Sequence, residues 1–310
     1  MKLKICLAAL LLTIVSFNKA FAVATTVDFL KLSVGARETA MGESAAAVCG
    51  DVTAMYWNPA GLAKIERKEV NFSHSDALMD ATLEFLGGAY SFGKYGTLAA
   101  GGIFYLIKPV PVTGMSGEVL GDLNWRDQAI ILSYGYKISE SLAVGAGVKY
   151  VQRLEDDPIF GSAQGSTYGL DAGLTYKTPL KGLDIGCALL NSGPELQMTG
   201  EKKKDALPQT TRAGLAYGFD TANNMSVTFA GDMFRVLGGE WSFGGGCEIF
   251  IHKMLGIRVG YYKKEGNIVG NTYGVGLKTG SIRIDVSNVP ASEIVGYTRS
   301  NKVSFSLLFD

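Results

Sequence analysis

The chain has 310 residues, and its 29 basic residues balance its 29 acidic residues, so the formal net charge at pH 7 is zero. A neutral chain has no electrostatic attraction for a phosphate backbone, which excludes nucleic acid as the expected partner. Glycine contributes 40 residues and charged residues only 19%, whereas Phe, Tyr and Trp number 15, 14 and 3. Disordered chains are rich in charge and poor in aromatic residues, so we expect this chain to fold.

The first 22 residues have the three parts of a secretory signal peptide. Lys2 and Lys4 form a basic start, residues 5–17 are apolar, and small residues at 20 and 22 match a cleavage site. The apolar stretch is too short to span a bilayer comfortably, so we expect a cleaved export signal and not a membrane anchor.

Three cysteines follow the signal, namely Cys49, Cys187 and Cys247. An odd and widely spaced set is no disulfide framework, and no C-x-x-C pair suggests a metal. We therefore expect buried or lipid-facing thiols, with no cofactor and no metal site.

A compact, punctuated segment follows near the start of the chain. Asp51 is positioned to begin a short helix that runs to Tyr56. Pro59 then disfavours helical geometry at Asn58, and Gly61 is expected to provide a left-handed turn. The pattern predicts a helix–turn unit that carries large aromatic side chains.

From residue 69 onward the sequence alternates apolar and small residues with a period of two, which is typical of strands with two different faces. In residues 211–219, one face carries Leu215 and Tyr217, and the other carries Gly214, Ala216 and Gly218. Most of these segments are about as long as the 9–11 residues that a tilted strand needs to cross a bilayer. Strands of this length predict a transmembrane sheet.

The pattern contains about fourteen such strands. Their predicted spans are 69–76, 82–93, 96–107, 127–138, 141–153, 165–178, 182–191, 209–219, 223–235, 239–251, 254–263, 269–280, 281–289 and 300–310. The long connections, 108–126, 154–164, 192–208 and 290–299, all follow odd-numbered strands, so they leave on one side. Outer-membrane barrels have long external loops and short periplasmic turns, and both ends of the barrel are expected in the periplasm.

These features predict an all-β fold, an antiparallel transmembrane β-barrel of about 14 strands with an N-terminal helical plug in its lumen. The expected division is a signal peptide at 1–22, a plug segment at 23–68 and the barrel at 69–310. The inner face of the barrel is mostly Gly, Ala, Thr and Ser, which leaves room for a backbone to pack inside, with Tyr56 or Trp57 against the small residues. A secreted soluble β-sandwich that binds a ligand is the alternative fold.

Residues 27–63, VDFLKLSVGARETAMGESAAAVCGDVTAMYWNPAGLA, resemble the N-terminal signature of PorV/PorQ-type outer-membrane proteins, which belong to the FadL/TodX superfamily of hydrophobic-compound transporters. The matching motifs are Phe29-Leu30, Gly35-Ala36-Arg37, Ala40-Met41-Gly42 and the run from Tyr56 to Leu62. The resemblance implies a plug motif made of Gly35, Arg37, Met41, Gly42, Tyr56, Trp57, Asn58, Pro59 and Gly61.

The same resemblance implies one of two functions in the outer membrane. PorV relatives handle export substrates at the cell surface in type IX secretion, and FadL relatives carry fatty acids or other hydrophobic small molecules. The expected partners are outer-membrane lipid, the barrel-assembly machinery, and either type IX secretion components with their cargo or a hydrophobic small molecule.

The external loops lack the long apolar insertions that capture fatty acids in FadL transporters. Their absence favours the hypothesis of a role in type IX secretion over that of fatty-acid uptake. Loop 108–126 is the candidate hydrophobic docking surface, through Pro109, Val110, Pro111, Val112, Met115, Val119 and Leu120.

The sequence does not predict an enzyme. The two histidines are His74, whose neighbouring serines point to the other face of its strand, and His252, which lies in a short turn without an acid beside it. The acidic run 155–157 is expected to be solvated in an external loop, and the glycines at 244–246 lie inside a strand and not in a phosphate-binding loop.

Overall fold

The computed structural model describes residues 27–77, 80–221, 224–265, 268–290 and 299–309. The expected signal peptide at 1–22 and most of the expected connection 290–299 lie outside these residues. The long strands are β1 (Lys68–Asp76), β2 (Thr82–Ser91), β3 (Thr97–Leu106), β5 (Val119–Lys137), β6 (Leu142–Asp157), β7 (Gly161–Lys177), β8 (Leu183–Ser192), β11 (Thr210–Thr221), β12 (Met225–Val236), β13 (Trp241–Ile251), β14 (Leu255–Lys264), β15 (Ile268–Thr279), β16 (Ile282–Pro290) and β17 (Arg299–Phe309). Three short strands are β4 (Val110–Thr113), β9 (Leu196–Gln197) and β10 (Lys204–Asp205).

Within the described residues, fourteen strands pair in an antiparallel ring. Each long strand pairs with its neighbours in chain order, β1 pairs with β17, and the pairing of β3 with β5 passes over the small strand β4. The expected all-β barrel of 14 strands is therefore confirmed, and the alternative of a β-sandwich is wrong. A closed ring leaves no edge among these strands, which meets the requirement that lipid imposes on backbone polar groups.

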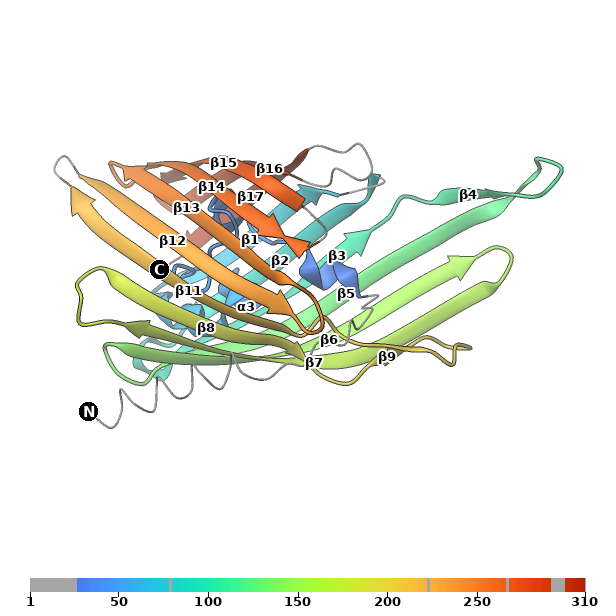
Figure 1. Cartoon of the computed structure of the whole chain (residues 1–310), viewed down its shortest axis with the longest axis horizontal. Helices are drawn as coiled ribbons and strands as arrows, with labels where there is room; N and C mark the ends of the chain where they lie inside the picture. The colour runs from blue at the N-terminus through green and yellow to red at the C-terminus, as the bar shows by residue number, and fades with distance from the viewer. Residues whose placement is uncertain (1–26, 78–79, 222–223, 266–267, 291–298, 310) are drawn as a thin grey trace.

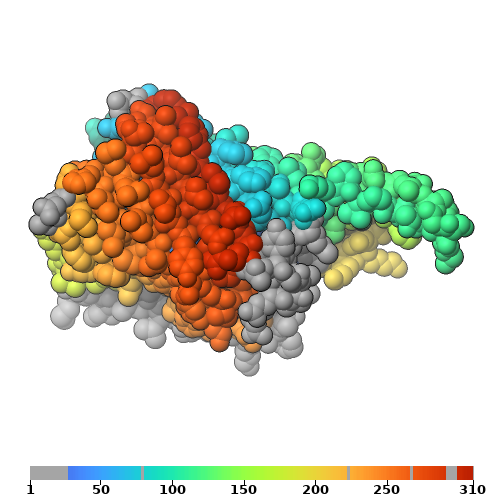
Figure 2. Space-filling view, turned by 90° about the horizontal axis from the view of Figure 1, so that it is seen from above, coloured from blue at the N-terminus to red at the C-terminus, as the bar shows by residue number. Residues whose placement is uncertain are grey.

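The predicted strand ends agree with the structure to within a few residues, except on one side of the barrel. β5, β6 and β7 are 19, 16 and 17 residues long. Their pairing continues beyond the expected ends, with Asn124 opposite Asp156 and Leu154 opposite Gln164. The expected loops 108–126 and 154–164 are therefore largely hairpins, because pairing satisfies the backbone N–H and C=O groups of a projecting segment. Figures 1 and 2 show this green extension projecting beyond the body of the barrel.

The two ends of the barrel differ. The end that carries β4, β9 and β10 has the long connections, and the opposite end has tight turns such as those around Ser139 and Gly280. We call these the external and periplasmic ends, following the general asymmetry of outer-membrane barrels.

The outward face of the strands is apolar and the inward face is buried. Leu215 is 53% exposed, whereas Ala216, its neighbour in β11, is 6% exposed. The same alternation places Val259, Tyr261, Val275 and Leu277 among the exposed large side chains of β14 and β15. In the described part of the chain, no helix has the length and apolarity needed to cross a membrane.

The N-terminal segment, residues 27–65, lies inside the barrel (Figure 1). It forms four short helical pieces, η1 (Asp28–Lys31), α2 (Ala36–Ala40), α3 (Ala54–Trp57) and η2 (Pro59–Lys64); one further piece, η4 (Gly93–Tyr95), lies in the β2–β3 turn. α2 contacts β14 to β17, while η2 contacts β3 and β5 to β7. The segment thus reaches across the lumen, and its apolar residues form one core with Phe85, Ile103 and Ile131 of the wall.

A pair of substitutions in β11 tests the assignment of the two faces. Leu215→Arg should lower the free energy of unfolding by about 2–4 kcal/mol, because a charge would sit near the bilayer midplane. The control, Ala216→Ser, should change it little because that side chain faces the lumen. Unfolding by denaturant in phospholipid vesicles measures both values, and equal losses would contradict the assignment.

Candidate functional site

Glycines of the barrel wall bring the backbone of the N-terminal segment into direct contact with the strands. A Cβ atom at Gly145 would collide with Pro59, and one at Gly173 would collide with the side chain of Asn58. An added Cβ atom would also collide with this segment at glycines of other strands, namely Gly135, Gly186, Gly244, Gly246, Gly260 and Gly274. The expectation that a wall of small residues admits a closely packed backbone agrees with this geometry.

Asn58 and Pro59 fix the turn that contacts β6 and β7. Asn58 has an extended backbone (φ −163°, ψ 103°), as expected for a residue before proline. Its amide donates to the carbonyl oxygens of Ala46 at 2.7 Å and Leu174 at 3.2 Å, and its side-chain oxygen accepts from the backbone N–H of Ala60 at 3.1 Å. One side chain therefore caps η2, ties it to the preceding loop and anchors it to the wall.

Gly61 was expected to provide a left-handed turn, and this expectation is wrong. Gly61 lies inside η2 and is absent from the residues with positive φ, so it provides no left-handed turn. A Cβ there would lie 2.7 Å from the carbonyl oxygen of Cys49 and 3.0 Å from the Cβ of Ala54. Glycine is required at this position because two parts of the segment approach each other closely.

Tyr56 and Trp57 hold η1 and the strand-like link that follows it. The Tyr56 hydroxyl donates to the carbonyl oxygens of Leu30 at 3.1 Å and Leu32 at 2.9 Å, and the Trp57 indole donates to that of Val34 at 3.0 Å. Their rings meet edge to face with centroids 4.8 Å apart. These hydrogen bonds fold the start of the segment back over α3.

Cations of the wall lie over the two rings, since the guanidinium of Arg212 is 4.8 Å from the Trp57 ring centroid and the ammonium of Lys149 is 5.7 Å from that of Tyr56. Such contacts are attractive because the face of an aromatic ring is electron-rich. The expected packing of either ring on small residues of the wall stays a prediction.

The other members of the expected plug motif lie around α2. Gly35 precedes the helix with a φ of 81°, and Gly42 follows it with a φ of 66°. At Gly42, the carbonyl oxygens of Gly245 and Tyr261 occupy the space that a Cβ atom would need. Met41 is buried. Arg37 donates from Nε and Nη2 to the two carboxylate oxygens of Glu248 on β13, at 3.0 and 2.8 Å. The motif is thus dispersed over the segment and supports its packing, and its role as a plug is a proposal.

A buried chain of ion pairs joins α2 to the wall and returns to the loop before α3. It begins with Glu38, pairs in turn through Arg37, Glu248, Arg258, Asp285 and Arg283, and ends on both Asp51 and Glu69. The six pairs after the first have N–O distances of 2.5 to 3.2 Å. Breaking one such buried pair leaves a charge without compensation, which makes the chain a strong positional constraint.

A second anchor is Asp232 on β12. Its Oδ2 accepts from the backbone N–H groups of Ala45 at 3.0 Å and Ala46 at 2.9 Å, and from Arg212 at 2.8 Å. Arg212 also donates to the carbonyl oxygen of Glu43 at 2.7 Å. The wall therefore supplies partners for backbone groups that the short helices leave unpaired.

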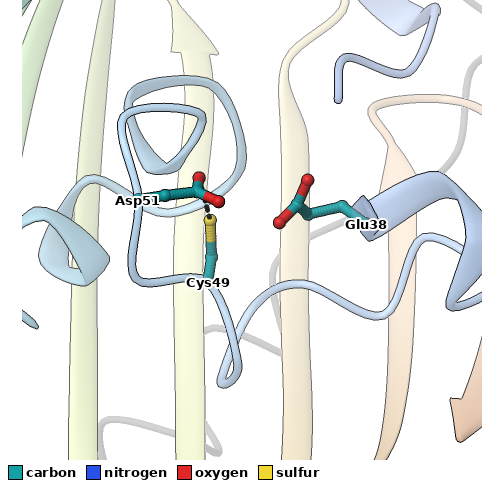
Figure 3. A group of neighbouring side chains, drawn as sticks. All are labelled: Glu38, Cys49 and Asp51. Atoms are coloured by element: carbon teal, nitrogen blue, oxygen red, sulfur yellow. Dashed lines mark hydrogen bonds between the residues drawn. The ribbon is translucent and has the colours of Figure 1, made fainter. Parts of the chain in front are cut away.

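Two of the three carboxyl groups that end this chain, Glu38 and Asp51, lie near each other and near the thiol of Cys49 (Figure 3). Burial, with the adjacent Asp51, raises the pKa of Glu38 to about 8. Burial acts in the same direction on Asp51, but Arg283 and Arg37 lower the pKa of that carboxyl below its ordinary value. Burial raises the pKa of the Cys49 thiol well above its usual range.

Two small pockets lie in the lumen on the external side of α3, with volumes of about 250 and 220 Å³. Leu32, Glu43, Lys264 and Ile268 line both. The larger one, which we call the inner pocket, has an apolar lining made of Leu30, Leu32, Tyr56, Trp57, Leu190, Phe234, Val236 and Ile268. Residues of the N-terminal segment form part of its lining, among them Leu30, Tyr56 and Trp57.

The cations at the inner pocket already have anionic partners. Lys264 lies 2.9 Å from Glu43. Burial raises the pKa of the Glu43 carboxyl, but Lys264, Arg212 and Lys302 together lower it below its ordinary value. Arg212 pairs with Asp232 at 2.8 Å, and Lys31 pairs with Asp28 at 2.9 Å. Among the described residues of its lining, no cation is left for the carboxylate of a ligand.

A larger pocket of about 750 Å³ lies at the external end, between the projecting parts of β5, β6 and β7. We call it the outer pocket. Its apolar lining is Leu106, Ile107, Pro109, Trp125, Leu154 and Ala163. Glu155 and Asp156 also line it. They lie on β6 and not in a loop as expected, while Asp156 is exposed to solvent as expected.

The expected docking surface 108–126 is the hairpin of β4 and β5. Val110, Met115, Val119 and Leu120 are exposed on it.

The two histidines lie in different places. His74 is on the outward side of β1, where Nδ1 lies 2.7 Å from Glu84, while Ser73 and Ser75 face the lumen. His252 is in the β13–β14 turn at the periplasmic end. The structure does not bring them together into one site.

Sequence reasoning missed the buried charges of the lumen. Arg212, Asp171 and Asp285 stand in mid-strand at positions that alternate with outward apolar residues, among glycine, alanine and serine. That placement could have indicated buried ion pairs, because an ionic side chain on the inner face of a filled barrel must find a partner. The identity of each partner could not be read from it.

The glycine contacts predict a specific sensitivity. Gly145→Ala should lower the free energy of unfolding by about 1–3 kcal/mol, because the added methyl group overlaps Pro59 and Ala60. The control is Gly218→Ala on β11, where the nearest atoms lie at 3.5 Å or more, and its loss should stay below about 0.5 kcal/mol. Denaturant unfolding in vesicles measures both, and equal losses would mean that the segment does not rest on the wall.

Solved structures with a similar fold include transporters and channels of hydrophobic compounds. The toluene transporter TbuX of Ralstonia pickettii has 16% sequence identity and a TM-score of 0.60, covering 90% of this chain and 99% of the other. The monoaromatic hydrocarbon channel CymD has 13% identity and a TM-score of 0.63, covering 92% and 99%. A FadL homologue from Pseudomonas aeruginosa has 13% identity and a TM-score of 0.53, covering 94% and 100%.

At these identities the similarity establishes a shared fold. Together with the closed ring and its apolar outer face, it identifies the protein as an outer-membrane β-barrel. No curated protein matches the chain. Residues 13–168, half of the chain, match the family described as "Uncharacterised protein family (UPF0164)", so the chain belongs to that family.

Proposed function

We propose that the protein carries uncharged hydrophobic small molecules across the outer membrane, with the N-terminal segment as a plug. The observation that carries the proposal is the inner pocket, where apolar residues of the N-terminal segment and of the wall line a cavity whose charged residues are paired. The similar structures include a toluene transporter and a monoaromatic hydrocarbon channel, which supports the same class of substrate.

The volume of the lumen pockets and the charges that line them restrict the class of substrate. Apolar cavities of about 150 Å³ hold benzene, so pockets of about 250 and 220 Å³ suit a single ring or a short alkyl chain. The cations of the inner pocket are already paired, so a carboxylate would have to displace an existing partner. We therefore favour an uncharged molecule over a fatty acid.

In this proposal the ligand passes through the outer pocket first and then through the inner pocket. The outer pocket offers Trp125 and Leu154 at the external end, and the inner pocket offers Trp57 and Phe234 deeper in the lumen. Each gives apolar contact with a few polar groups, as ligand sites usually do. Release to the periplasm then requires the N-terminal segment to move.

The other hypothesis, a role in type IX secretion, has less support. The similar structures named above are transporters and channels of small molecules, and the resemblance to PorV is confined to the N-terminal signature. The exposed apolar side chains of the projecting hairpins, including Met115, Val119 and Phe160, are what a protein cargo would contact under that reading.

A substitution at the junction of the two lumen pockets tests ligand binding. Ile268→Asp should weaken toluene binding about tenfold, because a charged group would enter an apolar lining. Ile268→Leu is the control and should bind normally. Equilibrium binding of toluene and of a long-chain fatty acid to the protein in micelles measures the effect. Tight, Ile268-independent binding of either would contradict the assigned pocket, and preference for the fatty acid would contradict the assigned substrate class.

Deletion of the N-terminal segment tests the plug. Without residues 27–63, the barrel should insert into planar bilayers and conduct ions, because the lumen loses the segment that crosses it. The intact protein should conduct little. Heat-modifiable mobility on gels checks that the deleted form is a folded barrel. A folded deletion mutant that stays closed would show that the external connections seal the lumen instead.

A further inference from the structure

The buried chain of ion pairs has an excess of negative charge and a gap. It contains five carboxyl groups and three guanidinium groups, so its fully ionised form carries two uncompensated negative charges. The chain almost closes on itself, because two of its end members, Glu38 and Asp51, face each other across a short gap that no ion pair between described residues bridges (Figure 3). A compensating positive charge would be most stabilised in that gap.

A third potential ligand faces the same gap. The Sγ of Cys49 lies 4.0 Å from Oδ1 of Asp51, and one ligand atom from each of Glu38, Cys49 and Asp51 lies within 4.8 Å of the others. The three residues are 1%, 1% and 3% exposed. Oε1 of Glu38 is fully buried, has no hydrogen bond in the described structure, and belongs to a carboxylate that points toward Asp51 and Cys49 in Figure 3.

The donor set selects the ion. Magnesium and calcium prefer oxygen ligands alone, whereas a thiolate with carboxylates suits zinc, which binds three or four such groups in a compact tetrahedron. One divalent ion would offset two of the three negative charges that the ionised ion-pair chain and the Cys49 thiolate carry together. We propose that Glu38, Cys49 and Asp51 form a Zn²⁺ site inside the N-terminal segment.

Neighbouring groups hold the ligands in position. Oδ1 of Asp51 accepts from the N–H of Thr53 at 3.0 Å and from its hydroxyl at 2.5 Å, while Oδ2 accepts from Arg283 at 2.8 Å. The Thr53 hydroxyl also lies 3.5 Å from the Cys49 sulfur. Such outer contacts orient metal ligands and commonly contribute to affinity. On binding, Zn²⁺ replaces the thiol proton of Cys49 and any proton on Glu38, and these protons pass to solvent.

The ion would add a direct link between two parts of the segment. Glu38 lies in α2, and Cys49 and Asp51 lie in the loop that leads to α3. Because these ligands come together only when the segment is folded, Zn²⁺ would bind the folded form and stabilise the plug conformation. The sequence alone predicted no metal, since Cys49 has no cysteine or histidine beside it.

Cobalt reports a thiolate ligand through its charge-transfer absorption. The full chain is unfolded with a chelator present, refolded in micelles with Co²⁺, and then titrated with Zn²⁺. We expect a near-ultraviolet band that corresponds to one ion per chain and disappears as Zn²⁺ displaces Co²⁺. Absence of the band in folded wild-type protein would overturn the proposal and would mean that protons balance the charge.

Three variants assign the ligands. Cys49→Ser should abolish the band, Glu38→Gln should raise the Kd for Zn²⁺ by about 10- to 100-fold, and Cys187→Ser, which changes a buried cysteine on β8, should do neither. Heat-modifiable mobility checks that each variant is folded. A band that survives Cys49→Ser or vanishes in Cys187→Ser would place the metal elsewhere and overturn the site. Metal binding is read independently of transport, so failure here leaves the proposed function untouched.

Discussion

The lumen of a fourteen-strand barrel is wide enough to admit another segment of chain, and that segment brings its own polar backbone into a space with little water. The structure meets this constraint in two ways. Glycines such as Gly145 and Gly173 let the backbone of the N-terminal segment lie against the strands. Buried charges of the wall, such as Asp232, then supply partners for N–H groups that the short helices cannot satisfy. The filling of the barrel and the shape of its wall therefore depend on each other.

The ion pairs set position more than they add stability. Desolvation offsets much of the attraction between buried charges, but a pair that is broken leaves a costly isolated ion. Because Arg37 has one partner on β13 and Asp51 has another on β16, a shift of the segment would break several pairs together. This coupling gives the segment one well-defined place, and it makes any opening a concerted event.

That arrangement has a direct consequence for the proposed transport. Tyr56 and Trp57 hydrogen-bond to the start of the N-terminal segment and also line the inner pocket. A ligand in the pocket can therefore alter the contacts that hold the segment. A metal ion between Glu38 and Asp51 would act on the opposite side, by strengthening the closed arrangement.

Much of the fold was determined by the sequence itself. Period-two alternation reports two environments locally, so strand number, strand faces and the barrel could be predicted, and the glycine-rich inner face indicated that something packs inside. The extra length of β5 to β7 was missed, because hairpin pairing beyond the membrane depends on a neighbour and not on hydrophobicity. Tertiary structure alone decided which charges meet. Arg37 and Glu248 are 211 positions apart, and Glu38, Cys49 and Asp51 converge only when the segment folds inside the barrel. No local pattern records such distances, because the partners are chosen by the closure of the ring.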